Sequence, residues 1–313
     1  RDVVRSRGLG DVYKRHSKDY NKFNKQIVHL DKKITTEKEF VNFSKEELRK
    51  RQYLSGYSIE DLELILHPMV EDAKEATGSM GDDTPVAVLS NHYRPISHYF
   101  RQNFSQVTNP PIDSLRENKV MSLKTRFGNL GNILDFENLT KENIYVLDSP
   151  VLTNSQLKKF KTMFSKKIKV IDCTFDTKNT LRNRIEEIRE EAEIAVRGGA
   201  NHLILSDQNI SEERAIVPMI LAVGAIHSYL VKLSLRGYAS LNAQTAEAMD
   251  THSFAVLIGV GATTVNPYLA IDSIFQRYEK KLFGELDFAS CVERFKKSIN
   301  AGLLKIMSKM GIS

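Results

Sequence analysis

The stretch IKVIDCTFDTKNTLRNRIEEIREEAEIAVRGGANHLIL, residues 168–205, holds the pattern that decides the fold. Its two ends, 168–171 and 202–205, are short apolar runs typical of buried strands. Between them, 181–197 has Ile185, Ile188 and Ala192 at helical spacing on one side and charged residues on the other. A strand, an amphipathic helix and a second strand in this order predict a parallel βαβ unit.

The same alternation continues on both sides of this stretch. Further strand-like runs lie at 144–147, 238–241 and 255–258, and helix-like runs lie at 155–164, 217–235 and 267–278. Short strands that are apolar on both faces favour a parallel sheet covered by helices. At least five βα units favour a TIM-barrel-like or partial barrel domain over a small doubly wound sheet. The predicted fold class is therefore α/β with a parallel sheet.

Residues 1–50 differ from the rest of the chain in composition. The net charge of the chain is +6, and residues 1–51 contribute +7 of it while the remainder contributes −1. Because this segment mixes both signs and has no Lys/Arg block, it predicts a solvated helical arm rather than a nucleic-acid-binding tail. Firmer helices begin at capping boxes that start at Ser44 and Ser58.

Several functional classes are excluded by composition. No stretch approaches the roughly 18 apolar residues of a membrane helix, and no signal peptide follows the basic opening, which predicts a cytoplasmic protein without a membrane partner. The two cysteines, Cys173 and Cys291, have no CxxC spacing and predict buried thiols rather than a disulfide, zinc or iron–sulfur site. The histidines lack the i, i+4 spacing of metal ligands.

Two short motifs each allow a functional and a structural interpretation. The segment 259–262, GVGA, resembles the start of a dinucleotide fingerprint, although Thr264 occupies the position that requires glycine or alanine. The glycines could equally let a turn pass close to a neighbour. Asp207 follows the strand at 202–205, where α/β proteins place functional loops, but it also suits an N-cap or turn.

An amide-rich helix is predicted before the double proline at 110–111. Phe100, Phe104 and Val107 give it an apolar face, and its other face carries amides instead of Lys and Glu. Amides that precede a rigid turn suit a polar contact held in fixed geometry, although they could also simply cap the helix and brace the turn.

Long strings in the chain resemble the central domain of the glutamate synthase large subunit, and the resemblance extends over about residues 50–313. They are SMGDDTPVAVLS at 79–90, FRQ at 100–102, QVTNPPID at 106–113, VMSL at 120–123, NPYLA at 266–270 and KIMSKMGIS at 305–313. Residues 242–255 depart from the usual family pattern, which has an acid, a glycine, an arginine and a histidine there.

The resemblance implies a role within a larger enzyme that makes two glutamates from glutamine and 2-oxoglutarate. An amidotransferase domain releases ammonia, which reaches an FMN domain with a 3Fe–4S cluster through a tunnel. Residues 1–50 would be the connector arm after the amidotransferase domain, and 51–313 the central domain. The resemblance assigns no catalytic group, cofactor or metal to this chain. The partners it implies are the two neighbouring domains and, as electron donor, a small NAD(P)H-oxidising subunit or ferredoxin, with no nucleic acid.

Seven residues are candidates for inter-domain or tunnel contacts: Asn103, Gln106, Thr108, Asn109, Asp82, Asp83 and Asn266. Two other classes of function remain open. The first is an autonomous TIM-barrel enzyme, which should show ionisable groups with perturbed pKa values at one end of the sheet. The second is a binding module that acts through the basic arm.

Overall fold

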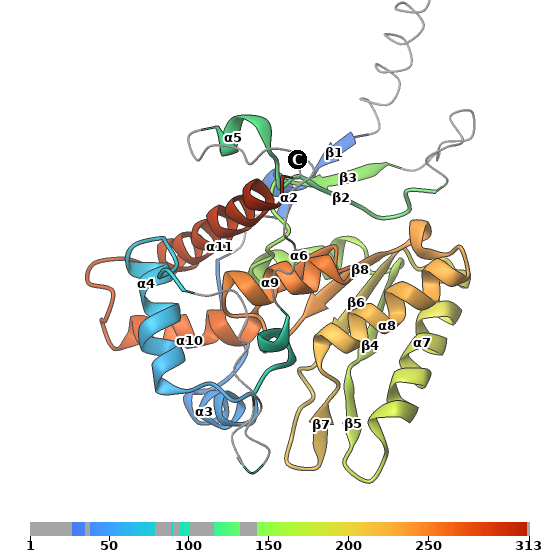
Figure 1. The fold of residues 1–313 in the computed structure, drawn as a ribbon, viewed down its shortest axis with the longest axis horizontal. Helices are drawn as coiled ribbons and strands as arrows, with labels where there is room; N and C mark the ends of the chain where they lie inside the picture. The colour runs from blue at the N-terminus through green and yellow to red at the C-terminus, as the bar shows by residue number, and fades with distance from the viewer. Residues whose placement is uncertain are drawn as a thin grey trace, which may run out of the picture.

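The computed structural model describes residues 27–34, 38–78, 89, 94–100, 116–131 and 143–311. Its centre is a parallel sheet in the order β4 (Ile168–Asp172), β6 (His202–Ser206), β8 (Ser240–Gln244) and β9 (Thr264–Asn266) (Figure 1). The register pairs Ile168 with His202, and His202 with Ser240. The predicted α/β fold with a parallel sheet is therefore confirmed, and the described strands form an open sheet.

Alternate side chains of β6 enter two different cores. Leu203 and Leu205 pack in the main core with α7 (Leu181–Arg197) and α8 (Met219–Lys232). Ile204 packs in a second core with α6 (Asn154–Met163). Because successive strand residues point to opposite faces, helices cover both sides of this sheet.

Two smaller sheets flank the central one. In the first, β3 (Ile144–Leu147) pairs with β1 (Ile27–His29) in parallel and with β2 (Thr125–Phe127) antiparallel. In the second, β5 (Thr174–Asp176) and β7 (Arg214–Ile216) form an antiparallel ribbon. The run at 144–147 is thus a strand, as predicted. The strands β3, β4, β6, β8 and β9 are each followed by a helix, and the last four of them form the described central sheet.

The predicted strand at 255–258 is wrong, because these residues lie inside helix α9 (Thr251–Gly259). Asp250 caps this helix by accepting a hydrogen bond from the Ser253 amide, so the helix starts before the apolar run. The GVGA segment therefore joins a helix to β9 and does not follow a strand as a phosphate loop would. Gly261 has a φ of 120°, and a Cβ there would collide with His227, which accounts for the glycine.

The remaining helices pack around these sheets. They are α2 (Asp31–Ile34), α3 (Lys45–Leu54), the π-helix η1 (Asp61–Leu66), α4 (His67–Glu71), the 3-10 helices η2 (Ile96–Tyr99) and η3 (Arg236–Tyr238), α5 (Glu117–Val120), α10 (Tyr268–Glu279) and α11 (Phe288–Met310). The predicted capping box at Ser58 is present, since the Ser58 hydroxyl accepts from the Asp61 amide and the Asp61 carboxylate accepts from the Ser58 amide. At the start of α3 the Ser44 hydroxyl accepts from the Glu47 amide, which is the N-cap half of the predicted box.

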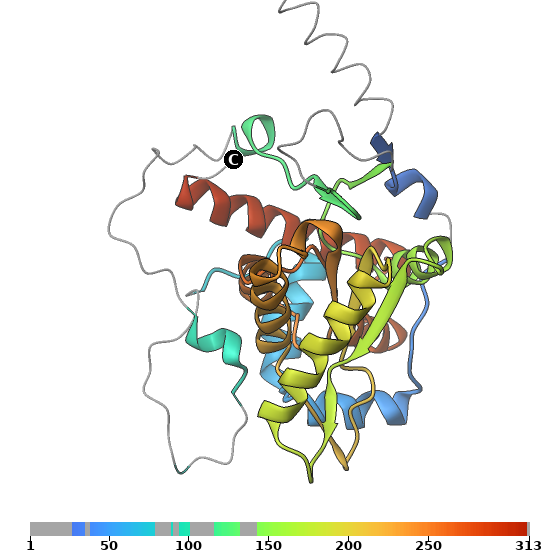
Figure 2. The ribbon, with the colours of Figure 1, turned by 90° about the vertical axis from the view of Figure 1, so that its right-hand side faces the viewer.

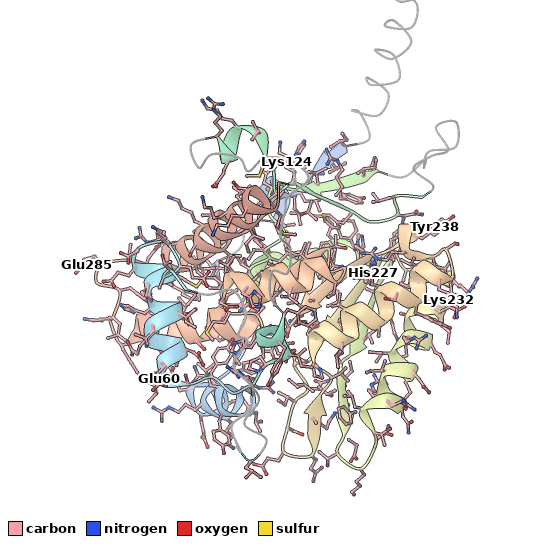
Figure 3. All side chains as sticks on the ribbon, in the orientation of Figure 1. Glu60, Lys124, His227, Lys232, Tyr238 and Glu285 are labelled. Atoms are coloured by element: carbon pink, nitrogen blue, oxygen red, sulfur yellow. The ribbon has the colours of Figure 1, made fainter. Side chains whose placement is uncertain are left out.

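The described ends of the chain lie at the same end of the molecule. Figures 1 and 2 both place β1 and the end of α11 there, with α3 and the β5–β7 ribbon at the opposite end. Residues 38–43 connect α2 to α3 along the domain. Charged side chains such as Glu60, Lys232 and Glu285 are exposed at the periphery (Figure 3). No helix in the described residues is long and apolar enough to cross a membrane.

Candidate functional site

Polar side chains gather at the carboxyl ends of the central strands. Each of these strands ends in a polar residue, and these residues are Asp172, Ser206, Gln244 and Asn266. The carboxyl ends of parallel strands are where open α/β sheets place their ligand sites. Two cavities near this edge differ in the charges of their walls.

Asp207 lies beneath this edge rather than in a cavity. Its carboxylate is fully buried and accepts hydrogen bonds from the Thr245 hydroxyl at 2.6 Å and the Ala246 amide at 3.0 Å. Burial raises the pKa of Asp207 to about 7, while these hydrogen bonds oppose the rise. Asp207 therefore braces the loop after β8, so the structure favours the structural interpretation of this residue.

The first cavity, called here the amide cavity, has a volume of about 360 Å³. Amide side chains dominate its wall, and they are Asn42, Asn154, Gln208, Gln244 and Asn266. Thr162, Lys158 and Lys161 of α6 complete its polar lining. Among the described residues that line this cavity, none carries a carboxylate.

Asn266 has an unmet hydrogen-bonding group in this wall. The side chain is only 1% exposed, and its Nδ2 donates to the Leu152 carbonyl at 2.9 Å and to Asn154 Oδ1 at 3.1 Å. Its Oδ1 is buried and has no hydrogen-bond partner within the described part of the chain. A buried acceptor without a donor is costly, so this amide locally destabilises the wall.

Lys161 provides a positive charge in the amide cavity. Its Nζ donates to Gln244 Oε1 at 2.9 Å, and Gln244 pairs in register with Asn266 on the neighbouring strand. Burial lowers the pKa of Lys161 below its usual value. The Lys158 ammonium lies 5.2 Å from the centroid of the Phe40 ring.

A buried carboxylate holds the wall of the amide cavity in place. Asp272 of α10 accepts from the Asn42 amide at 2.7 Å, the Phe43 amide at 3.2 Å, Asn42 Nδ2 at 3.2 Å and Asn154 Nδ2 at 3.0 Å. Burial raises the pKa of Asp272 to about 7, against the effect of these donors. Asp272 therefore helps to fix segment 38–43 to the domain, together with the hydrogen bond from Asn154 Nδ2 to the Phe40 carbonyl.

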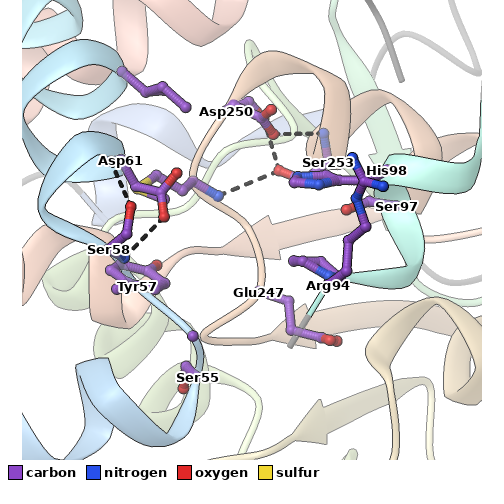
Figure 4. A pocket seen from close by; sticks show the side chains of 14 residues that line it. Ser55, Tyr57, Ser58, Asp61, Arg94, Ser97, His98, Glu247, Asp250 and Ser253 are labelled. Atoms are coloured by element: carbon purple, nitrogen blue, oxygen red, sulfur yellow. Dashed lines mark hydrogen bonds between the residues drawn. The ribbon is translucent and has the colours of Figure 1, made fainter. Parts of the chain in front are cut away.

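The second cavity, of about 380 Å³, is lined by charged residues (Figure 4). Its carboxylates are engaged with backbone amides: Asp61 accepts from Ser58, Asp250 from Ser253, and Glu247 from Met219. Arg94 and His98 are also in the wall, and burial lowers the pKa of His98. These carboxylates serve as caps for helices, so the cavity does not present an assembled nucleophile and base.

The prediction that both cysteines are buried thiols is confirmed. Cys173 and Cys291 are buried and free. Burial raises the pKa of Cys173 well above its usual value, which makes this thiol inert. Within the described ranges, no group of three or more His, Cys, Asp and Glu side chains could hold a metal ion.

Only one of the seven predicted contact residues can be placed. Asn266 lies in the amide cavity, whereas Asn103, Gln106, Thr108, Asn109, Asp82 and Asp83 lie outside the described residues. The same holds for most of the predicted amide-rich helix and of the strand-like run at 86–89. Sequence reasoning missed Asn42, Asn154, Gln244 and Lys161. Two consecutive strands end in a polar residue, and this pattern in the sequence could have predicted that Gln244 and Asn266 lie together.

Comparison with known proteins identifies similar chains. Residues 50–313 match the family model described as the glutamate synthase central domain. The glutamate synthase [NADPH] large chain of Azospirillum brasilense is 53% identical over 302 residues, which cover 95% of this chain and 20% of the relative. The glutamate synthase [NADPH] large chain of Bacillus subtilis is 39% identical over 273 residues, which cover 85% of this chain and 17% of the relative.

A ferredoxin-dependent enzyme is also similar. Ferredoxin-dependent glutamate synthase 2 of Synechocystis is 38% identical over 281 residues, covering 84% of this chain and 18% of the relative. The chain therefore spans about a fifth of the length of these curated relatives. A solved structure of a flavocytochrome b2 mutant aligns over 57% of this chain and 54% of that chain, at 12% identity and a TM-score of 0.31, which is too low to bear on the fold.

Proposed function

This chain belongs to the family of glutamate synthase central domains, and we propose that it connects the amidotransferase and FMN domains and forms part of the ammonia path between them. The chain corresponds to about a fifth of its relatives, so the remaining domains of such an enzyme would lie outside it. Both described ends lie at one end of the molecule, which would bring the domains attached there close together (Figure 1).

The amide cavity carries this proposal. Ammonia must stay unprotonated to act as a nucleophile, and a nearby carboxylate would favour ammonium instead. The described wall of the amide cavity has neutral amides and lysines, whereas the second cavity has three carboxylates. The amide side chains of this wall offer neutral carbonyl acceptors to an N–H of ammonia. The amide cavity is therefore the better match to this small neutral donor.

Filling the amide cavity should uncouple the full enzyme. Thr162 lines the cavity but is exposed, so Thr162→Phe should narrow the cavity with little effect on folding. We expect the ratio of glutamine hydrolysed to glutamate formed to rise, with free ammonia released. The measurement is that ratio in a glutamate synthase large chain that carries this domain, assayed with 2-oxoglutarate and its electron donor.

A neighbouring substitution provides the matched control. Met163→Phe places the same ring one residue further along α6, at an exposed position that does not line the cavity. It should leave the ratio of glutamine hydrolysed to glutamate formed unchanged. A wild-type ratio in Thr162→Phe would contradict the proposed path.

In this proposal, the cofactors bind to the other domains of the enzyme. FMN, the 3Fe–4S cluster and the NAD(P)H or ferredoxin donor would act outside this chain, and the cytoplasmic location expected from the sequence belongs to the same proposal. The purified 313-residue chain should therefore show no flavin absorption after incubation with FMN and gel filtration. A flavin spectrum that stays with the protein would overturn this assignment.

A further inference from the structure

Lys161 is the charged group best placed to act on a molecule in the amide cavity. Its side chain reaches from α6 to Gln244 at the end of β8, with a distance of 2.9 Å from Nζ to Oε1. Gln244 and Asn266 are register partners on adjacent strands, and both line the cavity. The Lys161 ammonium, the Gln244 amide and the Asn266 amide therefore lie in one wall, at the carboxyl edge of the sheet.

The charges around Lys161 leave its positive charge uncompensated within the described cavity wall. The other ionisable side chain that lines the cavity is Lys158, from the same helix. The residues contributed by segment 38–43, by β8, by β9 and by the loop after β6 are Phe40, Asn42, Gln244, Asn266 and Gln208, all without charge. Asp272 of α10 lies behind Asn42 and Asn154, to which it is hydrogen-bonded.

A fixed positive charge in a partly buried cavity discriminates between ammonia and ammonium. The two forms are nearly the same size, so a constriction cannot separate them, but a like charge repels only ammonium. This repulsion is much stronger in a partly desolvated cavity than in water. The repulsion therefore favours neutral ammonia, which is the form that the reaction needs, because ammonium has no lone pair with which to attack.

We propose that Lys161 is the residue that makes the amide cavity selective for neutral ammonia over ammonium. This inference rests on the proposed function, since it assumes that ammonia passes through this cavity. Lys161 would neither react with substrate nor transfer a proton. Its ammonium would raise the electrostatic cost of a second cation beside Gln244, and the Gln244 carbonyl would hold that ammonium in position.

The test replaces glutamine by ammonium chloride as nitrogen source in the full enzyme. In the wild type, glutamate formation should follow the concentration of free ammonia, so the rate at fixed total ammonia is low near neutral pH and rises steeply at alkaline pH. In Lys161→Met, ammonium is no longer repelled and also enters the cavity. The ammonium that then loses its proton to water can attack, so the rate near neutral pH should rise at least about tenfold. Each rate is divided by the glutamine-dependent rate at the same pH, which removes general effects on catalysis.

Two further variants separate the charge from the shape of Lys161. Lys161→Arg keeps the charge and should retain the steep wild-type pH profile. Lys166→Met removes an exposed lysine outside the cavity and should also leave the profile unchanged. A steep profile in Lys161→Met, or a flat one in Lys161→Arg, would overturn the inference.

The two experiments distinguish a failure of the Lys161 inference from a failure of the proposed ammonia path. If Thr162→Phe uncouples the enzyme and Lys161→Met keeps the wild-type profile, ammonia passes here and Lys161 is not its filter. If Thr162→Phe has no effect, the path itself lies elsewhere and the inference falls with it.

Discussion

Replacing His202 with phenylalanine is expected to remove a large part of the loss of stability that the wild-type chain suffers between about pH 6.5 and about pH 3. His202 is only 1% exposed and lies in the second core. Its ring centroid is 5.6 Å from that of Phe127, 4.9 Å from that of Phe160 and 4.5 Å from that of Phe164. Such an apolar site disfavours the imidazolium form.

The direction of the effect follows from proton uptake. Burial, helped by the charge of Lys167, lowers the pKa of His202 from 6.5 to about 3. Between these values the unfolded chain binds a proton that the folded chain does not, so the free energy of unfolding falls as the pH falls. At about 1.4 kcal/mol per pH unit, the loss is on the order of 3–5 kcal/mol. Phenylalanine binds no proton and escapes this loss.

The measurement is the free energy of unfolding in urea at a series of pH values. As the pH falls, the free energy of unfolding of the wild type should decrease more than that of the His202→Phe variant. This is expected whichever of the two proteins is more stable at neutral pH. His202 Nδ1 is 2.9 Å from Ser240 Oγ, and loss of this contact should cost the variant about 1 kcal/mol at neutral pH. Ser240 keeps Asn242 Nδ2 as a donor at 3.1 Å.

A surface histidine supplies the control for this experiment. His29 is exposed at the end of β1, and His29→Phe should leave the pH dependence of the free energy of unfolding unchanged. Parallel curves for the wild type and His202→Phe would show that His202 accepts its proton in the folded chain near its ordinary pKa. That result would contradict the burial argument.

The parts of the fold with strong periodicity were predictable from the sequence. Helix α7 has a regular apolar stripe, and β4 and β6 are short apolar runs on either side of it, so all three lie where expected. The run at 255–258 was assigned wrongly because four consecutive apolar residues suit a buried helix as well as a strand. The cap at Asp250, five residues earlier, was the signal that favours the helix.

The residues that line the amide cavity were harder to predict from the sequence than the fold. The amide cavity combines Asn42, Asn154, Gln244 and Asn266, which come from a connecting segment, a helix start and two strand ends. Contacts between such distant positions depend on the chain topology, and no local pattern encodes them. Asn266 was found beforehand because it lies in a string that resembles the family, and not because its chemistry stood out.

Buried carboxylates were the least predictable feature. Asp272 lies within helix α10, and in the sequence it is only one polar residue among the apolar residues of that helix. All its hydrogen-bond donors come from other elements. Its burial depends on segment 38–43 lying across α10, a contact between residues about 230 positions apart. The same carboxylate gives the second large expected effect.

Asp272→Asn should destabilise the domain by about 2–3 kcal/mol even though the two side chains have nearly the same shape. Both carboxylate oxygens accept from two N–H donors each: Oδ2 from the Asn42 and Phe43 amides, and Oδ1 from Asn42 Nδ2 and Asn154 Nδ2. The NH₂ group of asparagine would face one of these donor pairs, whichever way the amide is turned. Two buried donors would then lose their acceptor.

Hydrogen exchange offers a local readout beside the free energy of unfolding. The backbone amides of Asn42 and Phe43 donate to Asp272, so their exchange should become much faster in the variant, while exchange in the central strand β6 should follow the global stability. Asp148→Asn changes an exposed aspartate, and it should alter stability by less than about 0.5 kcal/mol. Unchanged exchange at Asn42 and Phe43 would mean that Asp272 does not hold this segment.

The same substitution links the packing of the domain to its proposed role. Phe40 and Asn42 form one side of the amide cavity, and Asp272 holds their segment against α10 and α6. If the cavity carries ammonia, Asp272→Asn should raise the ratio of glutamine hydrolysed to glutamate formed in the full enzyme at temperatures where the variant is still folded. A variant that is destabilised but fully coupled would separate the two roles. Asp272 would then stabilise the domain, and the position of segment 38–43 would not matter for the path.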